Sequence, residues 1–423
     1  MYQVFKLDNG IRVALKKMNE LRSVSFGVWI DAGSANEDKE YGGISHLIEH
    51  MLFKGTSNRS AKEIVTSIEN IGGELNAFTS KECTCYYAKV LDTHLDIAMD
   101  VISDMILNPL FLEEEIEKEK LVIYDEIDMY DDNPEEVCYD LSAELTYGEN
   151  HYGNPILGKK STIEEFNREK VIKYFNDNYK SDNIVISIAG NFKVEDVKRL
   201  LNQYFNTYRL LKSSESNMIE DEPEFASGCK SIYKDTEQLH ISIAFKGFKY
   251  QDKRLYPLVI VDNYLGSSAS SKLFQNIREK HGLAYGIYSF TTQYKEAGIF
   301  NIYFSIKQEN AGKVLSLVME EIEKLKNEYI DDDSIKRLKE QIKGSYILEL
   351  ESPLSFMEMM GKALLVSDYI KTEEEILTLI DNVKIDDVKD VIKQVFNKDM
   401  MNMSIVGNVT DDEAQDLWRI IND

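Results

Sequence analysis

The sequence predicts an α+β protein whose two domains arose by internal duplication. Strand patterns open the chain, and helical patterns follow without a strict alternation of the two. Two similar segments lie about half the chain apart, NIVISIAGNFKVEDV and MNMSIVGNVTDDEA, and each has the pattern of a strand that ends in Gly-Asn before an acidic helix start. A chain of 423 residues is long enough for two or three ordinary domains.

Other parts of the chain repeat in the same order. VSFGVWIDAG resembles ISIAFKGF, and HLDIAMDVISDMI resembles NAGKVLSLVMEEI. Between the copies lies LKSSESNMIEDEPEFASG, which is polar, acidic and without periodicity, as is typical of a linker. We therefore expect a first domain at 1–210, a linker at 211–227 and a second domain at 228–423.

The first elements are expected to be strands. YQVFKL and IRVALKK are joined through DNG, the pattern of a β-hairpin. In SVSFGVWI the apolar residues Val24, Phe26, Val28 and Ile30 alternate, which predicts a strand with one buried face. Helical periodicity then follows in HLIEHMLF, AKEIVTSIENI, HLDIAMDVISDMI and the long acidic FLEEEIEKEKLVIYDEIDMY.

Composition limits the possible functions. The formal net charge is −25, which argues against nucleic acid as a partner, because that binding depends on clustered Lys and Arg. The acidity is explained either by solubility or by an acidic cavity that attracts cationic peptides. No apolar run is long enough to cross a membrane and no signal region opens the chain, so we expect a soluble, cytoplasmic protein with no membrane contact.

Two of the six histidines lie one helical turn apart in GGISHLIEHMLFKGT. On a helix, His46 and His50 share a face, so their imidazoles can converge on one metal ion. Catalytic zinc typically takes three protein ligands and keeps one position for water. Glu49, directly before the second histidine, is a candidate general base for that water.

The long acidic helix offers candidates for the third ligand. Around the helix Glu126 falls about 20° from Glu119, and both lie within an apolar stripe formed with Val122, Ile123 and Ile127. Burying an unpaired carboxylate is costly, so a cation is expected opposite them. That cation is either a metal ion or a basic side chain.

With these motifs the sequence resembles the insulinase (pitrilysin) family of zinc metallopeptidases, which carry an inverted HxxEH motif. The resemblance covers essentially the whole chain, and its two-domain plan looks most like mitochondrial processing peptidase and its bacterial relatives. It implies that each domain is a mixed sheet covered by helices. It also implies that His46, His50 and Glu126 bind Zn²⁺, that Glu49 is catalytic, and that Glu119 supports the ligands from behind.

Two further stretches match substrate-handling segments of that family. In GGELNAFTSKECTCYYAKV, the resemblance places Asn76 and Ala77 beside the peptide, where an edge strand can hydrogen-bond an extended substrate. In LFQNIREKHGLAYGIYS, it assigns Arg278 and Tyr285 to substrate orientation and oxyanion stabilisation. An ordinary turn and ordinary packing are the structural alternatives for these segments.

The expected activity is that of a zinc endopeptidase that hydrolyses peptides or presequence-like segments inside a closed chamber. The second copy has SSASSKLFQNIRE where the first has paired histidines, so one zinc ion per chain is expected. The alternatives are a non-catalytic scaffold, as in respiratory-complex subunits of this fold, and a protein that only captures peptides. Because relatives of double length enclose peptides within four such domains, we expect a homodimer.

Overall fold

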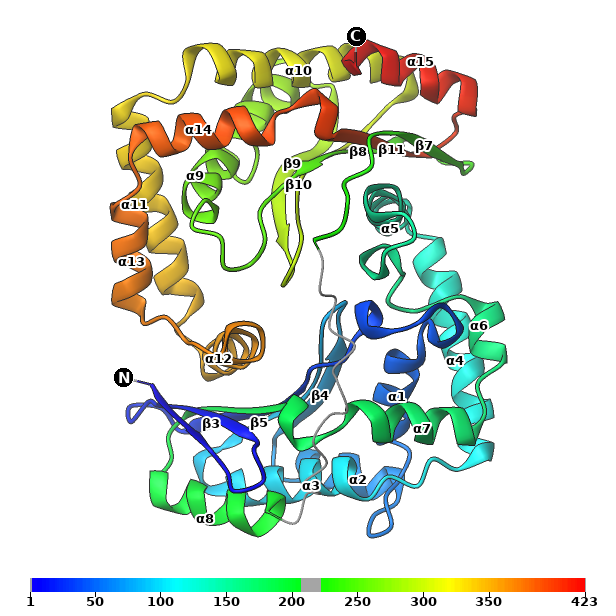
Figure 1. Ribbon diagram of the computed structural model, residues 1–423, viewed down its shortest axis with the longest axis vertical. Coiled ribbons are helices and arrows are strands. Elements are labelled where there is room, and N and C mark those ends of the chain that lie inside the picture. The colour runs from blue at the N-terminus through cyan, green and yellow to red at the C-terminus, as the bar shows by residue number, and fades with distance from the viewer. Residues whose placement is uncertain (1, 207–221, 423) are drawn as a thin grey trace. The chain divides into compact units, whose positions relative to one another are not determined.

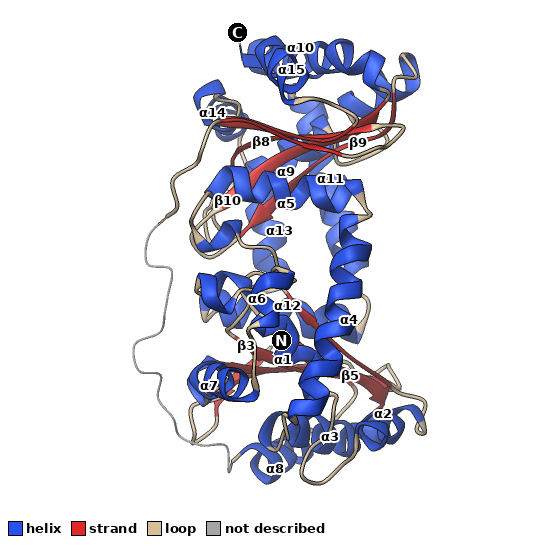
Figure 2. Ribbon diagram, turned by 90° about the vertical axis from the view of Figure 1, so that its right-hand side faces the viewer, coloured by secondary structure: helices blue, strands red, loops and turns tan. Residues whose placement is uncertain are grey.

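The protein is described by a computed structural model that covers residues 2–206 and 222–422. Its contacts divide the chain into two compact units, each built around one sheet with helices packed on it (Figures 1 and 2). Unit 1 comprises Met1–Ile127, Asn154–Met218 and Ile347–Thr372, and unit 2 comprises Asp128–Gly153, Ile219–Tyr346 and Glu373–Asp423. The expected fold class, two homologous α+β domains with mixed sheets, is confirmed.

Unit 1 contains a six-stranded mixed sheet in the order β1-β2-β6-β3-β5-β4. Only β2 and β6 run parallel, and the expected opening hairpin is formed by β1 and β2. The strands are β1 (Gln3–Lys6), β2 (Arg12–Lys17), β3 (Ser23–Ile30), β4 (Glu74–Thr79), β5 (Thr84–Leu91) and β6 (Ile184–Gly190). The helices are α1 (Ile44–Leu52), α2 (Ala61–Glu69), α3 (Leu95–Leu107), α4 (Glu113–Asp131), α6 (Lys160–Glu164), α7 (Arg168–Asn178), α8 (Val194–Phe205) and α12 (Pro353–Ser367).

Both faces of this sheet are covered by helices. Along β3 the side chains on one face are apolar, and those on the other face are small, apart from the aromatic Trp29. Val24, Phe26, Val28 and Ile30 are fully buried in the main core, as their alternation predicts. On the opposite face α12 packs on β3 and β6 (Figure 1). A Cβ on Gly361 of α12 would lie 2.0 Å from the Trp29 ring, so only glycine allows this approach.

Unit 2 repeats the same topology. Its five-stranded sheet has the order β7-β11-β8-β10-β9, again with one parallel pair, β7 and β11. The strands are β7 (Gly228–Tyr233), β8 (Leu239–Lys246), β9 (Ala284–Gln293), β10 (Gly298–Ile306) and β11 (Met401–Gly407). The helices are α5 (Pro134–Tyr147), α9 (Leu255–Leu265), the π-helix η6 (Phe274–Lys280), α10 (Ala311–Glu328), α11 (Asp332–Glu349), α13 (Glu373–Asp381), α14 (Ile385–Val395) and α15 (Asp411–Asn422).

The internal repeat noticed in the sequence corresponds to equivalent strands of the two sheets. β6 ends at Gly190 and β11 at Gly407, and both glycines have positive φ, +131° and +145°. A Cβ at Gly190 would lie 2.4 Å from the carbonyl oxygen of Ser23, so backbone conformation and space both require glycine there. The same turn ends the equivalent strand of each unit.

The compact units differ from the contiguous halves expected from the sequence. Helix α5 belongs to the first half of the sequence but packs on β8 and β11 of unit 2, whereas α12 from the second half packs in unit 1. The boundaries 1–210 and 228–423 therefore stay a prediction about the duplicated sequence. Most of the expected linker, 211–227, lies outside the described residues. Within the described chain, none of the helices combines the length and apolar character needed to cross a bilayer.

Candidate metal centre

Helix α1 brings His46 and His50 together. Leu47, Ile48 and Met51 of this helix are buried in the core of unit 1, which turns the two histidines towards the opposite side. Their ring centroids lie 4.6 Å apart, and their side chains are only 12% and 18% exposed. Burial lowers the pKa of His46 to about 4, so this imidazole is neutral at pH 7, the form that binds metal ions.

The start of α1 is held by Glu37, a contact that sequence reasoning missed. This carboxylate is fully buried and accepts hydrogen bonds from the backbone N–H groups of Gly43 and Ser45, both at 2.7 Å. Burial raises the pKa of Glu37 to about 7, although these bonds act in the opposite direction. A carboxylate at a helix N-terminus satisfies donors that have no partner within the helix, so Glu37 fixes the end from which His46 projects.

Helix α4 places Glu126 opposite both histidines. One of its carboxylate oxygens, Oε2, lies 3.7 Å from Nε2 of His46 and 3.6 Å from Nε2 of His50. Ligands at zinc distances of about 2.0–2.1 Å in tetrahedral geometry lie about 3.4 Å from one another. The three side chains therefore fit a zinc ion with little movement. Within residues 2–206 and 222–422, this is the one group of three or more His, Cys, Asp or Glu side chains whose donor atoms all lie within 4.8 Å of one another.

Glu119 contacts His50 at the ring nitrogen that faces away from Glu126, and it is also paired with Lys54. Its Oε2 lies 3.1 Å from Nδ1 of His50 and its Oε1 lies 2.6 Å from Nζ of Lys54. Although burial acts to raise it, the hydrogen bonds from His50 and Lys54 hold the pKa of Glu119 below its usual value. When Nδ1 of His50 donates to this carboxylate, Nε2 is left free to bind a metal ion.

Of the two alternatives that the sequence left open for the cation, a basic side chain is present beside one of the two carboxylates. Glu119 has a basic side chain beside it, and Glu126 faces the two histidines. The apolar stripe expected around them is only partly present, because Ile123 is fully buried while Val122 is 42% exposed. A helix that packs on a site with one face leaves its opposite face exposed to solvent.

Glu49 projects from α1 beside the two histidines and contacts β4. Its Oε2 accepts a hydrogen bond of 2.5 Å from the hydroxyl of Thr79, the last residue of that strand. Burial raises the pKa of Glu49. Thr79 was not identified in the sequence, although strand alternation places it on the same face as Ala77.

Strand β4 is one of the two edge strands of the unit 1 sheet, as the substrate-strand prediction requires, because among the described strands it pairs only with β5. Ala77 is half-buried against the core below α1, whereas Asn76 is exposed. Successive residues of a strand point to opposite faces, so the two side chains do not act on the same side. The Asn76 side chain accepts the backbone N–H of Ala77 at 2.8 Å.

Arg278 and Tyr285 lie in unit 2 and are brought together there. Arg278 is part of the π-helix η6, a conformation that often occurs at functional sites. Its guanidinium lies 4.7 Å from the ring centroid of Phe274 and 5.8 Å from that of Tyr285. Tyr285 is 77% exposed and Arg278 is also exposed, so both polar groups are accessible to a ligand.

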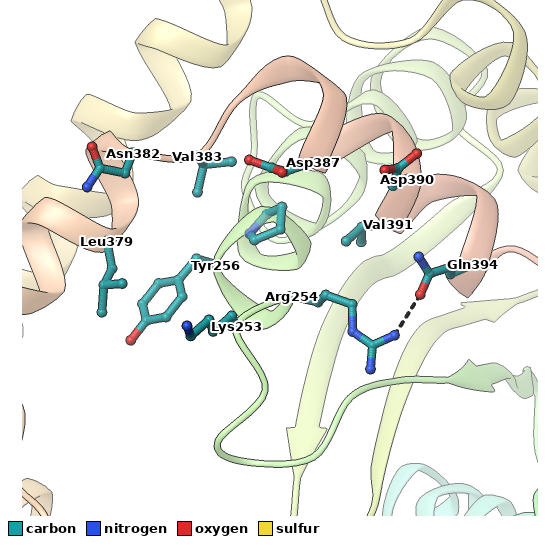
Figure 3. Close-up of a pocket in the computed structure, with 11 residues that line it drawn as sticks. Lys253, Arg254, Tyr256, Leu379, Asn382, Val383, Asp387, Asp390, Val391 and Gln394 are labelled. Carbon is teal, nitrogen blue, oxygen red and sulfur yellow. Dashed lines mark hydrogen bonds between the residues drawn. The ribbon is translucent and has the colours of Figure 1, made fainter.

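Unit 2 also contains a surface pocket of about 350 Å³, between the start of α9 and helices α13 and α14 (Figure 3). It is lined by Lys253, Arg254, Tyr256, Pro257, Leu379, Asn382, Val383, Asp387, Asp390, Val391 and Gln394. Arg254 donates a hydrogen bond of 2.7 Å to Gln394 and forms an ion pair with Asp252, so its positive charge is balanced within the protein. His46, His50 and Glu126 are not among the residues that line this pocket.

A helix with the HxxEH motif opposite a glutamate from a second helix is the arrangement expected of the inverted HxxEH class of metallopeptidases. Comparison with protein families agrees with this class. The model described as Insulinase (Peptidase family M16) matches residues 12–160, and the model described as Peptidase M16 inactive domain matches residues 165–342. The chain belongs to the insulinase family, peptidase family M16, which confirms the resemblance noted in the sequence.

Relatives match along nearly the whole chain. The "Uncharacterized zinc protease YmxG" of Bacillus subtilis is 41% identical, over 94% of this chain and 97% of the relative. The "Uncharacterized zinc protease SCO5738" of Streptomyces coelicolor is 33% identical, over 97% and 90%. Among solved structures, a protease from Helicobacter pylori has a TM-score of 0.88 at 20% identity, covering 96% of this chain and 99% of that one. A peptidase M16 inactive domain from Pseudomonas fluorescens has a TM-score of 0.90 at 18% identity, covering 97% and 98%. These two structures share the fold.

Proposed function

We propose that the protein is a zinc endopeptidase that hydrolyses peptides or presequence-like segments. The observation that carries this proposal is the set formed by His46, His50 and Glu126, whose spacing fits tetrahedral zinc. The relatives named as zinc proteases support the same metal and the same reaction class. Since one such group occurs among the described residues, one zinc ion per chain is proposed.

Bound zinc would polarise the scissile carbonyl and lower the pKa of an attacking water to about 7. Glu49 takes the proton from that water and passes it to the leaving amine. Because Oε2 of Glu49 is bonded to Thr79, Oε1 is the atom free to accept the proton. Glu119 holds Nδ1 of His50, which would leave Nε2 of that ring as the nitrogen that binds the metal.

Substrate binding is assigned to two places. The edge strand β4, with Asn76 and Ala77, would add an extended peptide as a further strand, so that recognition depends mostly on the backbone. Arg278 and Tyr285 would orient the peptide and stabilise the oxyanion. The proposal includes a closed chamber and a homodimer, which rest on the family resemblance, and a cytoplasmic location, which rests on the sequence pattern.

The test is hydrolysis of a peptide library by the purified protein, with and without a chelator. We expect cleavage that is lost with the chelator and restored by zinc. Glu49→Gln should keep its zinc and lose turnover to below a few per cent, because an amide cannot accept the proton. Peptide binding without cleavage would identify a capturing protein instead, and neither binding nor cleavage would favour a scaffold.

A further inference from the structure

The hydroxyl of Thr79 makes a hydrogen bond to the carboxylate of Glu49. A hydroxyl carries a single hydrogen, and that of Thr79 is directed at Glu49 Oε2 at 2.5 Å. The neighbouring hydroxyl of Thr84, directly opposite in the β4–β5 register, donates to the carbonyl oxygen of Ala32 at 2.9 Å. The hydroxyl oxygens of Thr79 and Thr84 lie 3.4 Å apart. Because the hydrogen of the Thr84 hydroxyl is donated to Ala32, Thr84 does not compete with Thr79 for Glu49.

The end of β4 that carries Thr79 is held tightly by its surroundings. The turn that follows closes with a hydrogen bond from the N–H of Ser80 to the carbonyl of Cys83 at 2.8 Å. The loop after β3 then binds this turn, because Ser34 and Ala35 donate their N–H groups to the carbonyls of Ser80 and Lys81 at 3.2 and 2.7 Å. A Cβ on Gly33 would lie 2.2 Å from the Ser80 oxygen, so the approach requires glycine.

The same loop leads to Glu37, which caps the start of α1. One rigid connection therefore fixes both ends of the Thr79–Glu49 contact, the strand end through Ser34 and Ala35 and the helix through Glu37. A hydrogen bond between two fixed elements restricts the side chain that it holds, since Glu49 otherwise has several rotamers to choose from.

We propose that Thr79 is a positioning residue for the general base. Its hydroxyl holds one carboxylate oxygen of Glu49 and so directs the other towards the attacking water. Because Thr79 lies on the edge strand assigned to the substrate, the peptide and the base are aligned by one element. This inference rests on the proposed function, and it adds a residue that the HxxEH motif does not contain.

Thr79→Val removes the hydroxyl and keeps the shape of the side chain. We expect kcat to fall about 10- to 100-fold, a part of what a general base contributes, with KM and zinc content within about twofold of the wild type. Thr79→Ser should recover most of the loss. Thr84→Val is the matched control, because it removes a buried hydroxyl of the same hairpin that does not bond Glu49; it should lower the melting temperature and leave kcat within about twofold.

A second readout uses the metal-free protein and needs no activity. With methyl-labelled threonine, Glu49→Gln should shift the methyl resonance of Thr79 more than that of Thr84. Equal shifts, a Thr79→Val variant that keeps more than half of kcat, or a Thr79→Ser variant as impaired as the valine would each overturn the inference. If the wild type shows no zinc-dependent hydrolysis, the proposed function fails while the resonance shifts still decide whether Thr79 holds Glu49.

Discussion

Replacing Glu126 and Glu119 one at a time by Gln tests the assignment of the metal ligands. The two residues lie two turns apart on α4, and the substitution is the same at both. Glu126 faces Nε2 of both histidines at 3.6 and 3.7 Å, whereas Glu119 faces Nδ1 of His50 at 3.1 Å. The expected effects differ because only the first position would bond directly to the metal.

The sizes of the two effects follow from the geometry. Structural zinc sites with four ligands bind with apparent free energies of about 10–16 kcal/mol, or about 3 kcal/mol per ligand. Losing the Glu126 carboxylate should therefore weaken zinc binding by more than about 100-fold. Partners that act through a ligand contribute about 10- to 100-fold. Glu119→Gln keeps an oxygen for His50 but loses the charge that balances Lys54, so we expect the lower end, about 10-fold.

The assay is competition for zinc between each variant and a fluorescent chelator, with a melting curve to show that the protein is folded. Asp125→Asn is the control, since Asp125 precedes Glu126 on the same helix but is exposed. Its zinc affinity should equal that of the wild type. A larger loss for Glu119→Gln than for Glu126→Gln would show that the ligand was assigned two helical turns away from its true position. Equal losses for all three variants would mean that only the overall charge of α4 matters.

Two further outcomes are expected. Burial raises the pKa of Asp262, whose carboxylate accepts a hydrogen bond from Ser289, from 3.8 to about 7. Between these two pH values the folded state keeps a proton that the unfolded chain loses, so the free energy of unfolding falls as the pH rises from about 4 to about 7. Asp262→Asn cannot ionise, so its free energy of unfolding relative to that of the wild type should increase from about pH 4 to about pH 7, by about 4 kcal/mol in all. A difference that is constant over this range contradicts the expectation. If active sites are shared between the chains of a homodimer, mixing Glu49→Gln chains with Arg278→Ala chains should restore activity, because each mixed dimer regains one complete site. If activity does not return although subunit exchange is verified, sharing of the sites is excluded.

The elements of the fold could be predicted where the determinants are local. The alternation of Val24, Phe26, Val28 and Ile30 predicts a strand with one buried face, and these four side chains are fully buried in β3. The repeat was visible because the strands that end at Gly190 and Gly407 need the same positive-φ glycine. The exchange of α5 and α12 between the units could not be predicted, since both helices read only as amphipathic or apolar segments whose partners lie far away in the sequence.

The site divides in the same way. The proximity of His46, Glu49 and His50 could be predicted because a single helical turn determines their spacing. The assignment of Glu126 rather than Glu119 as a ligand rests on the family resemblance. Lys54 and Thr79 were missed because their contacts join a loop to a helix and a strand to a helix. No periodicity within one segment reports such pairs, and each contact was accessible only once the elements had been placed in space.

The four glutamates around α1 have different partners, and these differences match the different roles proposed for them. Glu37 accepts backbone N–H groups and fixes the helix, and Glu119 is paired with Lys54, so neither is free to bind an ion from solution. Glu126 has only imidazole nitrogens opposite it among the ion pairs described, which leaves its charge for a metal. Glu49 is held by one hydroxyl at one oxygen, so its other oxygen can exchange a proton.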